Sequence, residues 1–496
     1  MATEKYGVYA QLVKSIASTP VATDTTVIFI GASPSGDLNQ PVLVTSLSDY
    51  QSKLGGAPGD GYNLTEAAIA AFSVAGIAQV YMIPVSNSLS FNAADYLGNA
   101  DLFTGVYAIE NLLRDNPTTV NLLCAPSVTD SSVIAALNTI AKKADGHWVS
   151  FMVYDLPLDE SHTNARNVIQ PSAIVADKQL NEEHADAVWG KVRTAGGYDI
   201  SGAAVRACLM AASDANYGVP ARCGGNLAVS GIQGIIGFED VAEQEGEWAA
   251  HTATIAIGET SVVDTHVFSE LDYSSKLDYS VSKTSLSDED WTATVEVVES
   301  SGHPAIKVTV TRKNPGDTSA AIGASIVALT LTGERNYTSR FAVMPESAGT
   351  QLSADGVCSW INYGGGNWHT WGDHTSAFSA GSVSDERARY DSNIRILTML
   401  TNRYQLKYRF DIDNPMTLSM RNSVIQEEND YLAYLKSIGA IIGEASCQFR
   451  ADDNPSDNIA LGQFVWSIEA TITPPMKYAQ LNVAFSQAGY SVYYAA

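Results

Sequence analysis

The chain has 496 residues, which is too long for one simple hydrophobic core, so we expect two to four domains. Its 45% hydrophobic and 17% charged residues are typical of a globular protein. The sequence contains no apolar run of about 18 residues, so we expect no membrane-spanning helix. A formal net charge of −25 argues against wrapping nucleic acid, and fits either solubility through self-repulsion or a partner with a basic surface.

The five cysteines are scattered along the chain and form no C-x-x-C pair. This pattern predicts buried thiols, not a disulfide scaffold or a zinc site. Because the number is odd, an inter-subunit disulfide stays open as an alternative.

Residues 1–20 are predicted to form an arm. The segment Tyr6-Gly7-Val8-Tyr9 and the following Leu12 and Val13 are of the strand type, but no partner strand lies nearby in the sequence. The first residues also lack the basic and apolar segments of a secretory signal, so we expect none.

Two β-α-β units follow the arm. Each has a short apolar strand, a segment with helical spacing of apolar residues, and a second strand. Such alternation is typical of an α/β layer with parallel strand pairing. Asn63 and Glu66 resemble a capping box at the first helix. The predicted strands are 26–31, 79–83, 120–126 and 148–155, and the predicted helices are 63–75 and 130–141.

The composition changes after Ile232. No Lys or Arg occurs between Arg222 and Lys276, and the segments 291–298 and 305–311 then alternate with period 2. We therefore predict a separate antiparallel β-rich module over 255–344.

The last quarter returns to mixed α/β patterning. A helix over 415–438 is predicted, with Asp413 or Asn414 as its cap and Pro415 at its first position. A strand over 464–472 and a strand-like tail at 481–485 follow. The predicted apolar faces consist of Met420, Val424, Tyr431, Leu435 and Ile438 on the helix, Phe464, Trp466, Ile468, Ala470 and Ile472 on the strand, and Leu481, Val483 and Phe485 on the tail.

A search for chemistry finds little. No P-loop, dinucleotide-binding or nucleophile-elbow motif occurs. His369, Asp373 and His374 are the best metal-like cluster, but Gly372 argues against the helix that would align them. Asp155 ends a strand, where either a catalytic acid or a turn-forming residue can lie. We therefore expect no catalytic residue, no cofactor and no metal.

Several segments resemble the contractile-tail sheath proteins of bacteriophages and related injection machines, in that family's order. Residues 6–9 are similar to its P-G-V-Y arm, with Tyr6 in place of Pro, and His374 stands where a W-G-x-R-T motif has Arg. The other similar segments are 65–85, 120–126 with 154–157, 202–206 with Asp214 and 219–221, 352–357, 371–375 and the C-terminal order of elements after 413. Asn226 comes later than the family pattern has it.

The resemblance implies an α/β multidomain fold with interlocking chain ends. It divides the chain into an N-terminal arm at 1–20, a conserved mixed α/β sheath core at 21–86 and 345–480, an α/β middle domain at 87–254, an inserted antiparallel β-rich outer module at 255–344, and a C-terminal arm at 481–496.

The resemblance also implies a function. It predicts a structural, non-enzymatic subunit that polymerises as a helical sleeve of stacked rings, hexameric by analogy, around an inner tail tube. Contraction would drive the tube through a bacterial envelope to deliver a genome or effectors. The implied partners are further copies, the tube, baseplate and tail-terminator proteins, without direct nucleic-acid contact or membrane insertion. The implied location is the tail of a virion or injection particle assembled in a bacterial cytoplasm.

Three groups of site residues follow from the resemblance. The inter-subunit arms comprise Tyr6, Gly7, Val8, Tyr9, Leu12, Val13, Leu481, Val483 and Phe485. The strand that receives neighbouring arms comprises Phe464, Trp466, Ile468 and Ile472. The candidates to face the tube are Glu427, Glu428, Asp430 and Lys436, for which an ordinary solvated helix face is the alternative.

Two other functions compete with this prediction. An α/β enzyme with an accessory β module would need a pocket with convergent polar residues. An adhesin or carbohydrate-binding protein built around 255–344 would need an export signal or a fused fibre, and neither is visible in the sequence.

Overall fold

The computed structural model describes residues 25–142, 148–162, 169–236, 346–363, 367–379, 386–488 and 490, together with Lys313 and six strands between 251 and 332. The predicted arm at 1–20 lies outside the described residues. The chain divides into two compact units: residues 1–162, 170–237 and 344–496 form the first, and residues 163–169 and 238–343 form the second. The second unit overlaps the predicted module at 255–344.

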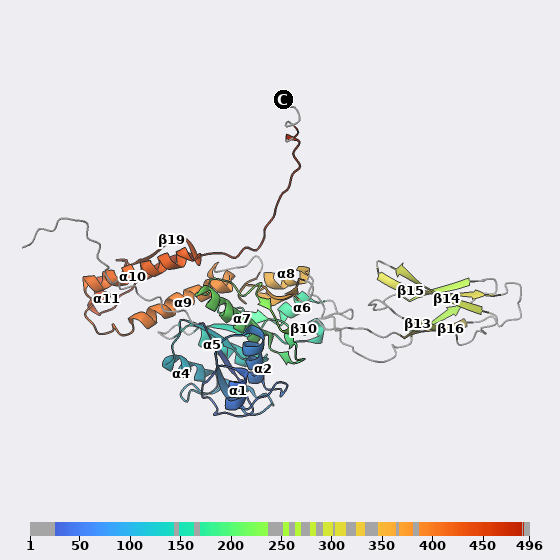
Figure 1. Ribbon diagram of the computed structural model, residues 1–496, viewed down its shortest axis with the longest axis horizontal. Coiled ribbons are helices and arrows are strands. Elements are labelled where there is room, and N and C mark those ends of the chain that lie inside the picture. The colour runs from blue at the N-terminus through green and yellow to red at the C-terminus, as the bar shows by residue number, and fades with distance from the viewer. Residues whose placement is uncertain are drawn as a thin grey trace, which may run out of the picture. The chain divides into compact units, whose positions relative to one another are not determined.

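A nine-stranded sheet in the order β2-β3-β1-β4-β5-β6-β17-β18-β9 organises the first unit (Figure 1). The strands from β3 through β17 pair in parallel, and β2, β18 and β9 add antiparallel pairs at the edges. The strands are β1 Thr25–Ala32, β2 Val42–Val44, β3 Val80–Ser86, β4 Val120–Cys124, β5 Phe151–Asp155, β6 Ala185–Val188, β9 Ala228–Val229, β17 Val357–Asn362 and β18 Trp368–Trp371.

The central strands are buried because both faces of the sheet are covered. Every residue of β4 and β5 is buried, as is usual in parallel sheets. The predicted parallel α/β layer is confirmed. The sheet takes strands from both the predicted core segments and the predicted middle domain, so these segments share one layer.

Helices cover this sheet. The helix α7 is buried over most of its length and packs against β1, β4 and β5. The helices are α1 Leu47–Leu54, α2 Asn63–Ile69, α3 Ala93–Leu97, α4 Ala108–Asp115, α5 Ser131–Ala141, α6 Pro171–Ala176, α7 Gly202–Tyr217 and α8 Glu346–Ala354. A smaller antiparallel sheet of β7 Lys191–Thr194, β8 Asp199–Ile200 and β10 Ile232–Ile236 completes this part.

The predicted capping box at Asn63 is wrong. Tyr62 precedes the helix, and the Asn63 side chain instead accepts a bond from the backbone N–H of Ala32 at 2.6 Å and donates to the hydroxyl of Tyr96 at 2.8 Å. The helix continues as a π-helical turn over Ala70–Ala75, which ends at Gly76 with φ of 65°. The chain there needs a left-handed residue, which glycine supplies at little cost.

The second unit holds two antiparallel three-stranded sheets. β14 Trp291–Ser300 and β15 His303–Arg312 pair in the register Ser300↔His303, so the two alternating segments at 291–298 and 305–311 form an antiparallel pair. The other strands are β11 His251–Ala256, β12 Val263–Phe268, β13 Asp278–Lys283 and β16 Ala324–Thr332.

The C-terminal part consists of two long helices and a strand pair. They are α9 Asp391–Tyr408, α10 Leu418–Ser437, β19 Ile441–Gln448 and β20 Ser467–Ile472, with the short helix α11 Ser456–Ala460 between the strands. Figure 1 shows α10 beside β19, with α9 below them. Within the described ranges, no helix has both the length and the apolar character needed to cross a membrane.

The predicted start of α10 is wrong. Thr417 is the cap, because its hydroxyl accepts from the backbone N–H of Met420 at 3.1 Å. Pro415 lies before the helix, and Asp413 has φ of 67°, a left-handed conformation that ends the preceding turn. Ile438 follows the last helical residue and is exposed, so it does not belong to the buried face.

Candidate assembly interface

The strand pair β19–β20 lies on a hydrophobic base formed by α9 and α10. Buried residues recur on α10 at helical spacing and meet one buried face of α9. The apolar cluster contains Ile396, Met399 and Leu400 of α9, Tyr431, Leu432 and Leu435 of α10, and Ile441 of β19, with Ile468, Ala470 and Ile472 packed against it.

Glu428 is the main departure from the sequence prediction, because its side chain is only 1% exposed. Its carboxylate accepts from the guanidinium of Arg403 at 2.5 Å and from the hydroxyl of Tyr408 at 2.9 Å. The same guanidinium lies over the ring of Tyr431, 3.8 Å from its centre. Glu428 therefore holds α10 against α9 and cannot face a tube.

The other three predicted tube-facing residues lie toward solvent on α10. Glu427 forms a half-exposed ion pair with Lys407 at 2.7 Å, and Asp430 accepts from Gln426 at 2.8 Å. Lys436 is exposed in the last turn, where a positive charge complements the helix dipole. Their role toward a tube remains a prediction.

The receiving strand is shorter than predicted. It begins at Ser467, so Phe464 and Trp466 precede it. The Asn454 side chain binds both the backbone N–H and the carbonyl of Val465, at 2.8 and 2.9 Å. Since that amide takes the place of a neighbouring strand, the backbone at Val465 is satisfied without a sheet.

Phe464 and Trp466 form part of an aromatic cluster. Trp466 lies 5.5 Å from the ring of Phe449 and 6.3 Å from that of Tyr404, measured between ring centres. These rings pack around the turn that leads into β20, so Phe464 and Trp466 lie outside the strand itself.

Within β20 the alternation matches the sequence. Ile468, Ala470 and Ile472 are half-buried against the helices, while Glu469 and Thr471 are exposed. In the part of the chain that the structure describes, β19 and β20 form a two-stranded sheet, so each strand has one edge without a partner strand. Unpaired edges of this kind are templates for strand addition.

A groove of about 730 Å³ runs beside β20. All five residues from Ile468 to Ile472 line it, although alternate side chains point to opposite faces of the strand. Ile442 of β19 and the side chains of Arg387 and Arg389 also line it. Its other wall includes Tyr390 and Leu397 from the start of α9.

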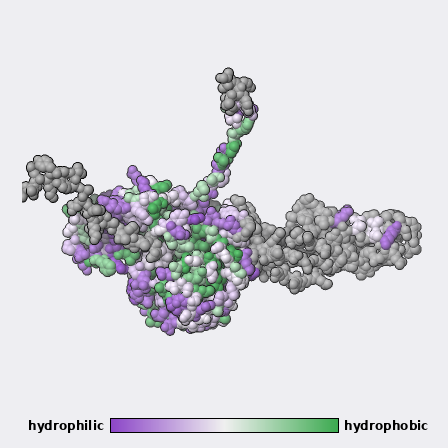
Figure 2. Space-filling view, in the orientation of Figure 1, coloured by the Kyte–Doolittle hydropathy of each residue, from purple (hydrophilic) through white to green (hydrophobic). Residues whose placement is uncertain are grey.

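The tail that follows β20 is extended and exposed. Leu481, Val483 and Phe485 are 78–85% exposed, and no strand forms among residues 473–488. Figure 2 shows hydrophobic residues along this projecting segment. Apolar residues at every second position predict a strand with one buried face, but here this face is exposed, apart from a ring contact between Phe485 and Tyr490.

Buried charge networks join α9 to the large sheet. Arg206 of α7 binds Asp186 of β6 at 2.7 Å and Asp391 of α9 at 3.1 Å, and Arg395 forms a buried ion pair with Asp214. Burial, followed by the charge of Asp186, raises the pKa of Asp391 to about 8. Arg206 and Asp214 belong to the segments that carry the sheath resemblance. Local spacing could not reveal their partners, which lie 20 to 185 residues away.

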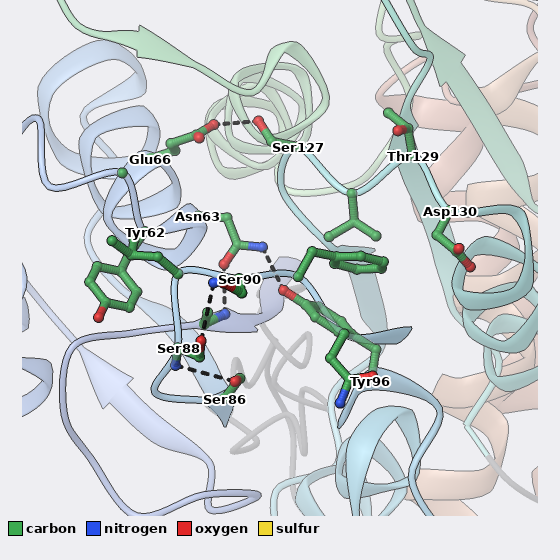
Figure 3. Close-up of a pocket in the computed structure, with 16 residues that line it drawn as sticks. Tyr62, Asn63, Glu66, Ser86, Ser88, Ser90, Tyr96, Ser127, Thr129 and Asp130 are labelled. Atoms are coloured by element: carbon green, nitrogen blue, oxygen red, sulfur yellow. Dashed lines mark hydrogen bonds between the residues drawn. The ribbon is translucent and has the colours of Figure 1, made fainter. Parts of the chain in front are cut away.

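A pocket of about 480 Å³ bears on the enzyme alternative (Figure 3). Ala32, Ser86 and Ser127, at the ends of or just beyond β1, β3 and β4, line it, which is the usual ligand position in α/β sheets. However, its polar groups bind one another. Glu66 accepts from Ser127 at 2.5 Å and from the backbone of Ser201 at 2.8 Å.

The acidic side chains that line this pocket or lie beside it have structural roles. Burial is the main cause that raises the pKa of Glu66 to about 6. Asp130 caps α5, and Asp155 accepts from Ser201 at 2.5 Å and from the backbone of Ala203 at 2.9 Å at the start of α7. Asp155 therefore serves as a helix-capping group.

His369, Asp373 and His374 do not converge. The ring of His374 stacks on Phe378 with 3.7 Å between ring centres, and its Nδ1 lies 2.7 Å from the carbonyl oxygen of Arg389. No cluster of three His, Cys, Asp or Glu suited to a metal occurs among the described residues. All five cysteines are free thiols.

Residues 383–486 match the sequence family described as the phage tail sheath C-terminal domain. The chain carries a phage tail sheath C-terminal domain. This domain contains α9, α10, β19, β20 and the described arm up to 486, which is the surface described above. The resemblance that the sequence predicted is thereby confirmed.

Solved structures extend the similarity to nearly the whole chain. A chain of the anti-feeding prophage (AFP) baseplate is 12% identical with a TM-score of 0.57, over 98% of this chain and 100% of that one. The PVC sheath complex of an extracellular contractile injection system, in the contracted state, is 14% identical with a TM-score of 0.57, over 99% of both chains. The AFP helical sheath in the contracted state is 12% identical with a TM-score of 0.55, over 98% of this chain and 100% of that one.

These similarities establish a shared fold and agree with the predicted mixed α/β class. A comparison with curated protein sequences finds no match.

Proposed function

We propose that the chain is a structural subunit of a contractile sheath, in which copies assemble into a helical sleeve around an inner tube. The sheath C-terminal domain at 383–486 carries this proposal, because it ends in an exposed, alternating apolar arm and also offers a free strand edge. The fold shared with sheath proteins of two injection systems supports it.

In the proposed assembly, chain ends of neighbouring copies add strands to the β19–β20 sheet. Main-chain hydrogen bonds to an edge supply affinity, and alternate side chains supply specificity. Leu481, Val483 and Phe485 would enter the groove beside β20, where Ile468 and Ile472 provide apolar surface. The N-terminal arm, with Tyr6 to Val13, is proposed to add a second strand.

Head-to-tail contacts that do not close on themselves build helical polymers. We therefore propose stacked hexameric rings that contract, drive the tube through a bacterial envelope and attach to baseplate and terminator proteins. Glu427, Asp430 and Lys436 remain the proposed tube-facing group, without Glu428. Such a sheath uses conformational energy, so the subunit is not an enzyme and needs no cofactor.

The test compares two matched triple variants of the tail by negative-stain electron microscopy. Substituting Asp at Leu481, Val483 and Phe485 should abolish tubes and rings, because the proposed strand would lose the apolar face that packs on Ile468 and Ile472. Substituting Asp at Asn482, Ala484 and Ser486 adds the same charge on the opposite face and should permit assembly. Equal assembly of the two variants would contradict strand addition by this arm.

The wild-type chain supplies the wider test of the sheath proposal. Purified protein at high concentration should form striated tubes or rings, and copies that stay monomeric would argue against a sheath subunit. Deletion of residues 1–18 should also prevent tube formation, and unimpaired tubes would rule out the N-terminal arm.

A further inference from the structure

Lys477 lies where the C-terminal arm leaves the folded body. Upstream, the backbone N–H of Thr473 still bonds to the carbonyl of Ala440 at 3.1 Å. On either side of Lys477, Met476 and Tyr478 are 83% and 79% exposed. Lys477 itself forms an ion pair with Asp373, whose side chain is only 4% exposed. The ammonium of Lys477 also lies 5.9 Å from the ring centre of Tyr390. An exposed segment thus has a charged contact with a buried partner.

Asp373 belongs to a buried group of acidic residues. The thiol of Cys223 lies 3.4 Å from its Oδ2, and its backbone carbonyl accepts from the N–H of Asp391 at 3.0 Å. Burial raises the pKa of both Asp186 and Asp391, and the charge of Asp373 raises both further. Arg206 and Arg395 supply positive charge inside this group, and the ammonium of Lys477 adds a third cation from the arm.

The energetic consequence follows from the burial of Asp373. Lys477 is 39% exposed and Asp373 4% exposed, so breaking their pair should cost more than breaking a fully exposed pair and less than breaking a buried one. When Lys477 withdraws, the carboxylate of Asp373 loses the cation that contacts it. The arm therefore has a preferred attachment point, although the residues around that point make little contact with the body.

We propose that the ion pair between Lys477 and Asp373 anchors the root of the C-terminal arm and sets where the arm leaves the body. This inference rests on the proposed function, since an anchored root would present Leu481, Val483 and Phe485 to a neighbouring copy from a fixed starting point. It adds Lys477 and Asp373 as positioning residues that strand addition alone does not require.

Trypsin cleavage after Lys477 provides a direct test. The protease must take the lysine side chain into its own pocket, so the ion pair should slow cleavage of the bond to Tyr478. Dilute, unassembled protein is digested, and the fragment that begins at Tyr478 is followed by mass spectrometry. In Asp373→Asn, cleavage should accelerate about fivefold or more, the factor equivalent to about 1 kcal/mol. Lys477→Arg keeps the charge and should remain protected.

Two controls separate anchoring from general loosening. Asp452→Asn removes a carboxylate from an exposed turn and should leave the cleavage rate unchanged. Cleavage after the buried Arg395 reports opening of the body, so acceleration confined to Lys477 supports the anchor. If Asp373→Asn also speeds cleavage after Arg395, the rate of cleavage after Lys477 is measured in the wild-type protein at increasing salt concentration. Salt screens a partly exposed ion pair, so the anchor predicts that this rate rises with salt. Rates are corrected with a peptide spanning Lys477.

Equal cleavage after Lys477 in the wild type and Asp373→Asn would overturn the anchor, as would a salt-independent rate in the wild type. Both results are obtained on unassembled protein, so either would leave the sheath proposal intact. Conversely, failure of the chain to form tubes would leave the cleavage result valid.

Discussion

The buried ion pair of Glu428 makes the sharpest prediction about stability. Replacement by Gln keeps the size of the side chain but removes the charge that pairs with Arg403. Breaking a buried pair by removing one partner costs about 3–5 kcal/mol. The Arg403 side chain is 10% exposed, and the Gln oxygen can still accept a hydrogen bond from Tyr408. We therefore expect Glu428→Gln to lower the free energy of opening by about 3 kcal/mol, at the low end of that range.

Glu427 supplies a matched control one residue away. Its pair with Lys407 is half-exposed, at 44% and 23% for the two side chains, so Glu427→Gln should cost less than about 1 kcal/mol. The assay is native-state hydrogen exchange at the amides of α10 and β19, which measures local opening without requiring two-state unfolding of the whole chain. Opening free energies of the two variants that agree within about 0.5 kcal/mol would refute the role of Glu428.

The remaining predictions concern other parts of the first unit. The folded-state pKa of Glu66, about 6, lies above its ordinary value of 4.5, so the folded state binds the proton of Glu66 more tightly than the unfolded state does. As the pH rises from 4.5 to 7 this proton is lost, and the free energy of unfolding should fall by about 2 kcal/mol. Glu66→Gln should remove that part of the pH dependence in urea titrations, and an unchanged slope would contradict it. Gly202→Ala should cost about 1–3 kcal/mol, because its Cβ would lie 2.1 Å from the carbonyl oxygen of Gly190; an unchanged melting temperature would show that the backbone shifts freely. Asn454→Ala should cost about 1–3 kcal/mol by leaving the backbone of Val465 unpaired, and hydrogen exchange at that amide should accelerate, whereas wild-type protection would show another partner.

The sequence by itself determined the parts of this protein that depend on local periodicity. Continuous apolar runs predicted the buried parallel strands β1, β3, β4 and β5, and period-2 alternation predicted the strands β14 and β15. The same alternation identified the inward face of β20 and the exposed apolar face of the arm at 481–485. In each case the burial of a residue follows from its position in a strand, so neighbours along the chain carry the information.

Tertiary structure alone decided which charges are buried and where some elements end. In the sequence, Glu428 is one of several acidic residues on α10. It is a core residue only because the fold places Arg403 of α9 against it. The sequence predicts that Val465 is part of a strand. In the structure the Asn454 side chain forms hydrogen bonds with the backbone N–H and carbonyl of Val465, and β20 begins two residues later. The partner of Lys477 is 104 residues upstream. Such pairs form between segments that the fold brings together, and the free energy of burying a charge depends on that partner, which local sequence does not specify.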